Sequence, residues 1–277
     1  MDKLHGGIVL PKKLTGTSAN INKIVKYYQF PVFYERELAL WDENPMYDGV
    51  PLRIFLYYNR LKYLGKNPKQ LSDLEIMRGF KIAGILRGYT VFNTKGMSEV
   101  LEKYDVKSVY DPCAGWGERL LCCFYHDVKY HGIDVNEKLL DGYADMILDY
   151  QAQDTCMVYR GDSSNVDVSD VDADMVFTCP PYYNIEIYSP YGAENMDYQS
   201  FLDWWDKVVK CSLAVNPRWF SFQINQKYKQ DMLNIVLNNG FVLEEEIALK
   251  KQSSHFTRKP GANRKSEYES VLVCKRV

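Results

Sequence analysis

The sequence has few of the residues that build a metal centre or a covalent framework. It contains 4 histidines and 7 cysteines, with neither a pair of Cys-x-x-Cys motifs nor a histidine cluster. An odd number of irregularly spaced cysteines, two of them adjacent at Cys122 and Cys123, argues against a disulfide framework and favours a reducing compartment. We therefore expect no metal site, no disulfides and a cytoplasmic location.

Long apolar runs and an excess of charge of one sign are also missing. We find no signal peptide, no apolar run long enough to cross a membrane and no internal repeat. The net charge is −2, so no global basic field indicates a nucleic-acid partner. What is present is an ordinary globular composition, 46% hydrophobic and 25% charged among 277 residues. This length suits one large α/β domain with an appendage, or two small domains.

The first part of the chain, residues 1–88, predicts a helical N-terminal region. Apolar spacing favours helices at 22–28 and 52–63, and an N-cap at Ser72 begins a third helix. The second helix carries basic and aromatic residues. The region is therefore either an appendage packed on the main domain or a module that recognises the target.

The second part, residues 89–277, alternates strands with helices. Strands are expected at 108–110, 129–133, 155–159, 174–178, 219–224, 242–249 and 270–274. Helices are expected at 98–104, 118–125, 137–150, 198–215 and 231–238. This alternation implies a mostly parallel seven-stranded sheet with helices on both faces. The last two strands follow a helix and flank a long loop, so we expect an antiparallel pair at one edge.

A turn of small residues joins the first strand to its helix. It reads Asp111-Pro112-Cys113-Ala114-Gly115-Trp116-Gly117. Glycine lets the backbone approach a ligand without a Cβ in the way. The turn has no third glycine and no Gly-Lys-Ser/Thr, so it is not a P-loop. An acid at Asp111 would repel a pyrophosphate and favour a cation or amino group, which suits S-adenosylmethionine better than a dinucleotide.

Acidic residues follow the next two strands. Asp134 comes about 20 residues beyond the glycine turn, where nucleoside-binding α/β folds place a carboxylate on the ribose hydroxyls. The alternative is that Asp134 caps the following helix. Asp162, with Ser163 beside it, follows the third strand and could accept a hydrogen bond from an adenine amino group; a cap or turn is again the alternative.

Two prolines end the fourth strand, in the sequence Thr178-Cys179-Pro180-Pro181-Tyr182-Tyr183. Successive prolines stop the ladder and hold the backbone rigid. A rigid carbonyl can hold an exocyclic amine while its lone pair attacks a methyl group, and the aromatic ring after the prolines can stack on a base held outside its helix. As a bare string, Pro-Pro-Tyr also occurs in linkers.

Taken together, these motifs resemble those of class I S-adenosylmethionine-dependent methyltransferases. More narrowly, Asp-Pro-Cys-Ala-Gly-Trp-Gly, Gly-Ile-Asp, Gly-Asp-Ser and Thr-Cys-Pro-Pro-Tyr-Tyr-Asn are similar to the DNA amino-methyltransferases that modify adenine N6 or cytosine N4. The string around the glycine turn is similar to DNA methylases carried by phages and plasmids. The match covers residues 89–277, and it implies a Rossmann-like fold, DNA methylation of the restriction-modification kind, and DNA as partner. A homodimer is left open.

By position, the resemblance assigns roles to particular residues. Asp111 and the glycines would line the methionine end of the cofactor, Asp134 its ribose, and Asp162 with Ser163 its adenine. The full cofactor set is Phe92, Thr94, Asp111, Cys113, Ala114, Gly115, Gly117, Asp134, Asp162 and Ser163. The catalytic set is Cys179, Pro180, Pro181 and Tyr182. The set facing nucleic acid is Tyr183, Arg258, Lys259, Arg264 and Lys265, the last four from the most basic loop of the chain.

The departure from the family pattern is Cys179, where the family has Asp, Asn or Ser. A thiol is a poor hydrogen-bond acceptor, so either the Pro180 carbonyl carries the contact to the amine or the activity is altered. The expected mechanism is direct in-line displacement without a covalent intermediate. Three alternatives stay open: attack on the ring by Cys179, as in cytosine-C5 methylation; an RNA-base or small-molecule substrate; and a non-catalytic protein that keeps the fold.

Overall fold

The computed structural model describes residues 15–16, 18–29, 32, 46–47, 50–51, 92–183, 196–250 and 268–277. The helices predicted at 52–63 and from Ser72, and the basic loop, lie outside these residues. A two-stranded antiparallel ribbon, β1 (Met46–Tyr47) with β2 (Val50–Pro51), is described for the first part of the chain. The remaining strands belong to a single sheet.

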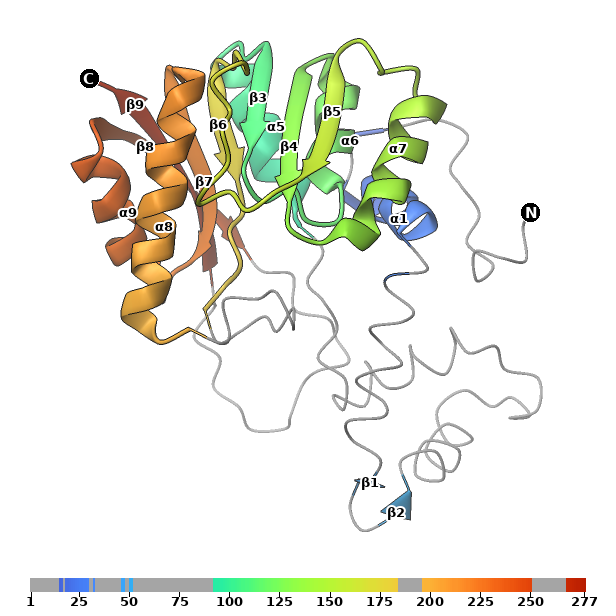
Figure 1. Ribbon diagram of the computed structural model, residues 1–277, viewed down its shortest axis with the longest axis horizontal. Coiled ribbons are helices and arrows are strands. Elements are labelled where there is room, and N and C mark those ends of the chain that lie inside the picture. The colour runs from blue at the N-terminus through green and yellow to red at the C-terminus, as the bar shows by residue number, and fades with distance from the viewer. Residues whose placement is uncertain are drawn as a thin grey trace.

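That sheet has seven strands in the order β5-β4-β3-β6-β7-β9-β8 (Figure 1). Their bounds are β3 (Ser108–Asp111), β4 (Lys129–Asp134), β5 (Cys156–Arg160), β6 (Met175–Thr178), β7 (Trp219–Asn225), β8 (Phe241–Lys250) and β9 (Tyr268–Arg276). All neighbours from β5 to β7 pair in parallel, and β9 is antiparallel to both β7 and β8. The predicted mostly parallel seven-stranded sheet and its antiparallel edge pair are confirmed, with the last strand inserted inside the sheet rather than at its rim.

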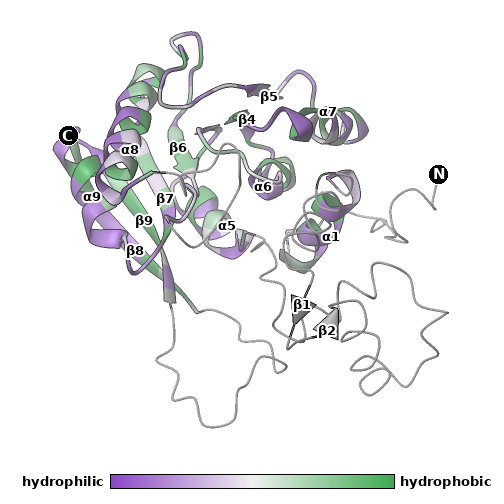
Figure 2. Cartoon of the chain, turned by 60° about the horizontal axis from the view of Figure 1, so that its bottom comes forward, coloured by the Kyte–Doolittle hydropathy of each residue, from purple (hydrophilic) through white to green (hydrophobic). Residues whose placement is uncertain are grey.

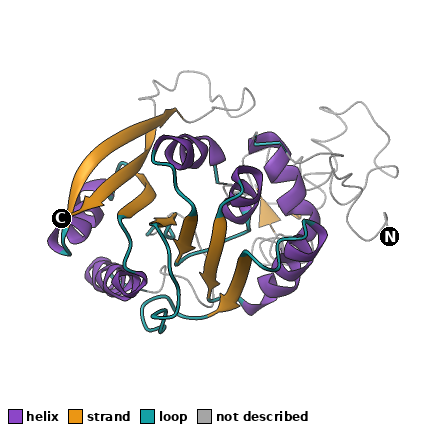
Figure 3. Cartoon of the chain, turned by 90° about the horizontal axis from the view of Figure 1, so that it is seen from above, coloured by secondary structure: helices purple, strands orange, loops and turns teal. Residues whose placement is uncertain are grey.

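Alternating side chains along the strands create two separate cores. In β6, Met175 and Phe177 pack on one face and Val176 on the other; in β9, Val273 and Leu272 divide in the same way. Strand residues two apart share a face, so each strand feeds both cores. Figure 3 shows helices on both sides of the strands. The alternation therefore explains why helices must cover both faces of this sheet.

The helices divide between the two cores. Buried residues of α5 (Thr94–Lys103), α6 (Glu118–His126) and α7 (Leu140–Asp149, after a 3-10 turn Glu137–Leu139) belong to one core. Those of α8 (Tyr198–Ser212, followed by a 3-10 turn Leu213–Val215) and α9 (Lys229–Asn238) belong to the other. Helix α5 begins earlier than the predicted residue 98, because the Asn93 side chain accepts a hydrogen bond from the Lys95 amide and caps it.

One helix of the N-terminal region packs on the sheet domain. Helix α1 (Ser18–Tyr28) lies against α6 and α7 (Figure 1 and Figure 2), with Ile21, Ile24 and Val25 fully buried in their core. Tyr28 Oη donates a hydrogen bond to Asp149 (2.6 Å), and the buried Gln29 donates from Nε2 to the Leu139 carbonyl (3.2 Å). This helix is thus an integral layer of the fold, while the division of the chain at residue 88 stays a prediction.

Gly142 of α7 lies close to Gln29, just beyond the end of α1, and it yields a test of this packing. A Cβ added there would lie 2.5 Å from Gln29 Oε1. Gly142→Ala should lower the free energy of unfolding by about 1–2 kcal/mol, because Gln29 must leave the Leu139 carbonyl. In a Gln29→Ala background, Gly142→Ala should leave the free energy of unfolding unchanged or raise it by up to about 1 kcal/mol, because alanine has a higher helix propensity than glycine. Urea unfolding of the four proteins measures both effects, and equal effects in the two backgrounds would contradict the contact.

Candidate functional site

The predicted motifs meet at one edge of the sheet. The chain runs outwards from β3 to β4 and β5, then returns to the other side of β3 as β6 and continues to β7. The strand order therefore reverses between β3 and β6, and ligands of open α/β sheets bind at the carboxyl ends of the strands beside such a point. The glycine turn follows β3, and Asp134 is the last residue of β4. Asp162 follows β5, and the two prolines follow β6.

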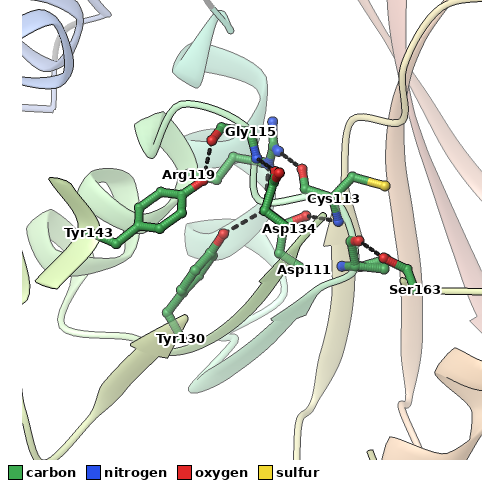
Figure 4. Close-up of polar contacts among 9 residues, drawn as sticks. Asp111, Cys113, Gly115, Arg119, Tyr130, Asp134, Tyr143 and Ser163 are labelled. Carbon is green, nitrogen blue, oxygen red and sulfur yellow. Dashed lines mark hydrogen bonds and ion pairs between the residues drawn. The ribbon is translucent and has the colours of Figure 1, made fainter. Parts of the chain in front are cut away.

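The glycine turn adopts a conformation that requires its glycines. Gly115 has φ +64° and Gly117 has φ +105°, in the left-handed region that side chains with a Cβ rarely adopt. A Cβ at Gly117 would also lie 2.9 Å from Met146 Cε of α7. From the same helix, the Tyr143 hydroxyl donates to the Gly115 carbonyl (Figure 4). The turn is therefore shaped by its own glycines and braced by α7.

The backbone amides of this turn bind within the protein. The Cys113 amide donates to Asp111 Oδ1 (3.1 Å), the Ala114 amide to the Ile133 carbonyl (2.8 Å), and the Gly115 amide to Asp134 Oδ2 (2.8 Å). A pyrophosphate site needs such amides to point at the ligand. Because three successive donors are already bound, this turn does not fit a dinucleotide phosphate.

Asp111 is neutralised inside the protein by Arg119, a residue that the sequence reasoning missed. The carboxylate is fully buried and accepts from Arg119 Nε (2.6 Å) and from Tyr130 Oη (2.7 Å) at the same oxygen, Oδ2. Arg119, also buried, donates in addition to the Cys113 carbonyl (Figure 4). The charge of Asp111 is thus compensated in place, and the predicted contact of Asp111 with a cationic ligand stays untested.

Asp134 accepts hydrogen bonds from two backbone amides, and it does not cap the helical segment that follows, because the N-cap of that 3-10 turn is Asn136. Its Oδ1 accepts from the Asn136 amide (2.9 Å), as in a turn before a helix, and its Oδ2 accepts from the glycine turn. Burial raises the pKa of this carboxyl to about 6. Each carboxylate oxygen has a second lone pair, so two hydroxyl donors can still bind to it. The ribose role stays a prediction that the geometry permits.

Asp162 and Ser163 shape a turn after β5. Asp162 is exposed, and its Oδ1 accepts from the amide (3.0 Å) and the hydroxyl (2.8 Å) of Ser164. The buried Ser163 hydroxyl donates to the Pro112 carbonyl and so ties this turn to the glycine turn (Figure 4). The predicted adenine contacts remain untested, and Ser163 has a second function in holding the two turns together.

The segment after β6 carries Cys179, Pro180, Pro181 and Tyr182; Cys179 packs against both cores, and Tyr182 belongs to the core under α8 and α9. The Cys179 thiol is half-buried and donates to Tyr182 Oη (3.7 Å). The Tyr182 ring is only 5% exposed, so a flipped base would stack on it only after this segment shifts. Tyr183 is half-buried, and its ring contacts those of Tyr198, Phe201 and Tyr228.

Phe92 and Thr94, predicted upstream members of the pocket, are both buried at the entry to α5. The Arg119 guanidinium sits over the Phe92 ring, 4.9 Å from its centroid, and Phe92 meets Phe177 of β6 edge to face at 6.2 Å. Thr94 is fully buried at the first position of α5. Arg258, Lys259, Arg264 and Lys265, the predicted basic contacts, lie outside the described residues.

Glu118 is the second residue that the sequence reasoning missed. It is the first residue of α6 and is 1% exposed, and the backbone amides of Glu118 and Phe92 lie near enough to its carboxyl group to act on its pKa in the lowering direction. Burial raises the pKa of this carboxyl to about 7. Among the described residues, Glu118, Asp111 and Asp134 bring three carboxyl groups to the turn, and Arg119 brings one guanidinium. This charge pattern disfavours an anionic ligand and favours a cationic one.

Two further observations concern the described part of the chain. None of its helices is long and apolar enough to cross a membrane. Within the same residues, no group of three or more His, Cys, Asp or Glu side chains is placed to hold a metal ion.

The buried pair at the glycine turn predicts a large and asymmetric stability effect. Arg119→Met leaves Asp111 without its counter-charge and should lower the free energy of unfolding by about 3–5 kcal/mol. Asp111→Asn added to Arg119→Met should recover part of this loss. Chemical denaturation measures both.

Lys210→Met is the control for that experiment, because it breaks a solvent-exposed pair with Asp206 and should change stability by less than about 1 kcal/mol. If Arg119→Met cost no more than this control, the pair would not hold the turn.

Comparisons with known proteins find similarity only among solved structures. No protein-family model matches the chain, and no curated protein matches it. An S-adenosylmethionine-dependent methyltransferase from Clostridium acetobutylicum ATCC 824 is 10% identical, with a TM-score of 0.45, over 66% of this chain and 90% of that one. TrmN from Thermus thermophilus is 14% identical, with a TM-score of 0.45, over 77% of this chain and 70% of that one.

A third similar structure is precorrin-6y C5,15-methyltransferase from Geobacter metallireducens GS-15. It is 12% identical, with a TM-score of 0.43, over 67% of this chain and 90% of that one. At such identities and TM-scores, these likenesses carry no argument about the reaction or substrate of this chain.

Proposed function

We propose that this protein transfers a methyl group from S-adenosylmethionine to an exocyclic amino group of a DNA base, with adenine N6 favoured over cytosine N4. The observation that carries the proposal is the glycine turn at the strand-order reversal. Its amides are bound internally and carboxyl groups surround it, so it suits a ligand that joins a cationic centre to a nucleoside. Pro180 follows the neighbouring strand, where the acceptor amine would lie.

The fit of the cofactor rests on residues from four loops. S-adenosylmethionine, when bound, supplies an electrophilic methyl group on a sulfonium centre. Gly115 and Gly117 let the backbone approach the amino-acid portion, with Cys113, Ala114, Phe92 and Thr94 around it. Asp134 accepts from the ribose hydroxyls at the end of β4, and Asp162 with Ser163 faces the adenine at the end of β5.

The acceptor side uses rigidity rather than acid–base chemistry. Pro180 and Pro181 hold the backbone after β6, and among the described residues no hydrogen bond is directed at the Pro180 carbonyl. That carbonyl accepts from the target amine and orients its lone pair. The Cys179 thiol donates to Tyr182 and, as a weak acceptor, adds little to the amine contact.

DNA as the polymer is supported by the order and spacing of the motifs, which resemble those of DNA amino-methyltransferases. Tyr183 and the basic residues Arg258, Lys259, Arg264 and Lys265 are the proposed contacts to the strand. A homodimer, if formed, would supply further surface for it.

The test is transfer of label from S-adenosyl-[methyl-³H]methionine to DNA, to RNA or to no polymer. Label in DNA, identified as N6-methyladenine or N4-methylcytosine by nucleoside mass analysis, would support the proposal. Label in RNA alone would redirect it to an RNA base. Absence of cofactor binding in calorimetry would overturn it.

Tyr182 gives a separate prediction within that assay. Tyr182→Ala removes the ring beside the acceptor site and should lower kcat for transfer by about 10²-fold or more, since base–aromatic stacking contributes about 1–3 kcal/mol and positioning is lost as well. Cofactor affinity should change by less than about threefold. Tyr182→Phe keeps the ring and is the matched control, expected to retain most activity. Equal losses of transfer and cofactor binding in Tyr182→Ala would contradict the role.

A further inference from the structure

The carboxyl group of Glu118 has a bonding capacity that the protein does not use. Glu118 is only 1% exposed, and one of its carboxyl oxygens, Oε1, is buried without a hydrogen-bond partner. The backbone amides of Glu118 and Phe92 lie near this carboxyl group, which therefore sits between the start of α6 and the segment entering α5. It therefore lies where the glycine turn and the upstream wall of the proposed cofactor pocket meet.

A buried carboxyl oxygen without a partner is costly in either protonation state. An ionised oxygen removed from water loses its donors, and a protonated one becomes a donor that lacks an acceptor. Buried carboxyl groups in native proteins are therefore paired, and each exception calls for an explanation. Among the described residues nothing supplies the missing bond, so a ligand group is the natural partner; because Oε1 is buried, the ligand reaches it only after the atoms that cover it shift, as at Tyr182.

The surroundings decide which chemical class of ligand group fits. The nearby guanidinium of Arg119 is already bound to Asp111 and to the Cys113 carbonyl. Asp111 and Asp134 add negative charge around the turn, so a second anion would be repelled. A hydrogen-bond donor that carries positive charge meets both requirements, because it satisfies the free oxygen and offsets the excess of carboxyl groups.

We propose that Glu118 binds the α-ammonium group of the amino-acid portion of the methyl donor. This inference rests on the proposed function, and it moves the ammonium contact from Asp111, which has a cationic partner of its own, to Glu118, which has none at Oε1. The contact identifies the donor by its amino-acid end, independently of the adenosine end held by the loops after β4 and β5.

A purely structural role for Glu118 would be to join the start of α6 to the Phe92 amide. That role affects all ligands of the pocket alike, because it acts through the shape of the pocket. An ammonium contact affects only ligands that carry the amino group. Comparing ligands with and without this group therefore separates the two roles.

The experiment is calorimetric titration of the whole chain with S-adenosylhomocysteine and with 5′-methylthioadenosine, which lacks the amino-acid portion. Glu118→Gln should weaken S-adenosylhomocysteine binding at least tenfold and leave 5′-methylthioadenosine binding within twofold. Glu102→Gln is the matched control, since that carboxylate is on α5 and largely exposed, and it should change neither affinity.

A wild-type measurement makes the test independent of how well the variant folds. The analogue of S-adenosylhomocysteine in which hydrogen replaces the α-amino group should bind wild type at least tenfold more weakly than S-adenosylhomocysteine. Equal binding of the two, or equal weakening of both ligands by Glu118→Gln, would overturn the assignment of Glu118 and leave the proposed function standing. Failure of wild type to bind any of the three compounds would overturn the proposed function and, with it, this inference.

Discussion

The buried pair between Asp111 and Arg119 is the interaction on which the geometry of the site depends. It joins the end of β3 to the first turn of α6, and Arg119 also reaches the Cys113 carbonyl within the intervening turn. Tyr130 of β4 donates to the same carboxylate oxygen. Because removing one partner would leave the other charge buried, the strand, turn and helix hold one arrangement. The position of the glycines is a result of this pair as much as of their own flexibility.

The same turn is tied to layers of the fold that lie further away. Tyr143 of α7 donates to the Gly115 carbonyl, and one residue before it Gly142 packs against Gln29 beyond the end of α1. The N-terminal helix therefore supports the helix that braces the glycine turn. A turn held in this way is preorganised, so that little ordering is left for a ligand of the proposed site to impose.

Local patterns in the sequence were enough to predict most of the sheet and the loops of the candidate site. The alternation of strand and helix segments located the strands, and the small residues around Gly115 located the turn. Side-chain contacts in the folded protein could not be predicted from these local patterns. No local pattern indicates that Arg119 pairs with Asp111, or that Glu118 has an oxygen without a hydrogen-bond partner. The early start of α5 was missed because its N-cap, Asn93, is followed by Gly96, which weakens the helical signal. The near-complete burial of Tyr182 likewise depends on packing between segments distant in sequence.

Strand β9 lies between β7 and β8 and is antiparallel to both, yet it follows both in the chain. Until β9 is synthesised, β7 lacks one neighbour and β8 has no partner in the sheet. During synthesis, the edges of β7 and β8 therefore expose unpaired backbone N–H and C=O groups until the ribosome has completed β9. The sheet is complete only when β9 has paired with both strands, and removing β9 would leave those edges open to pairing with other chains.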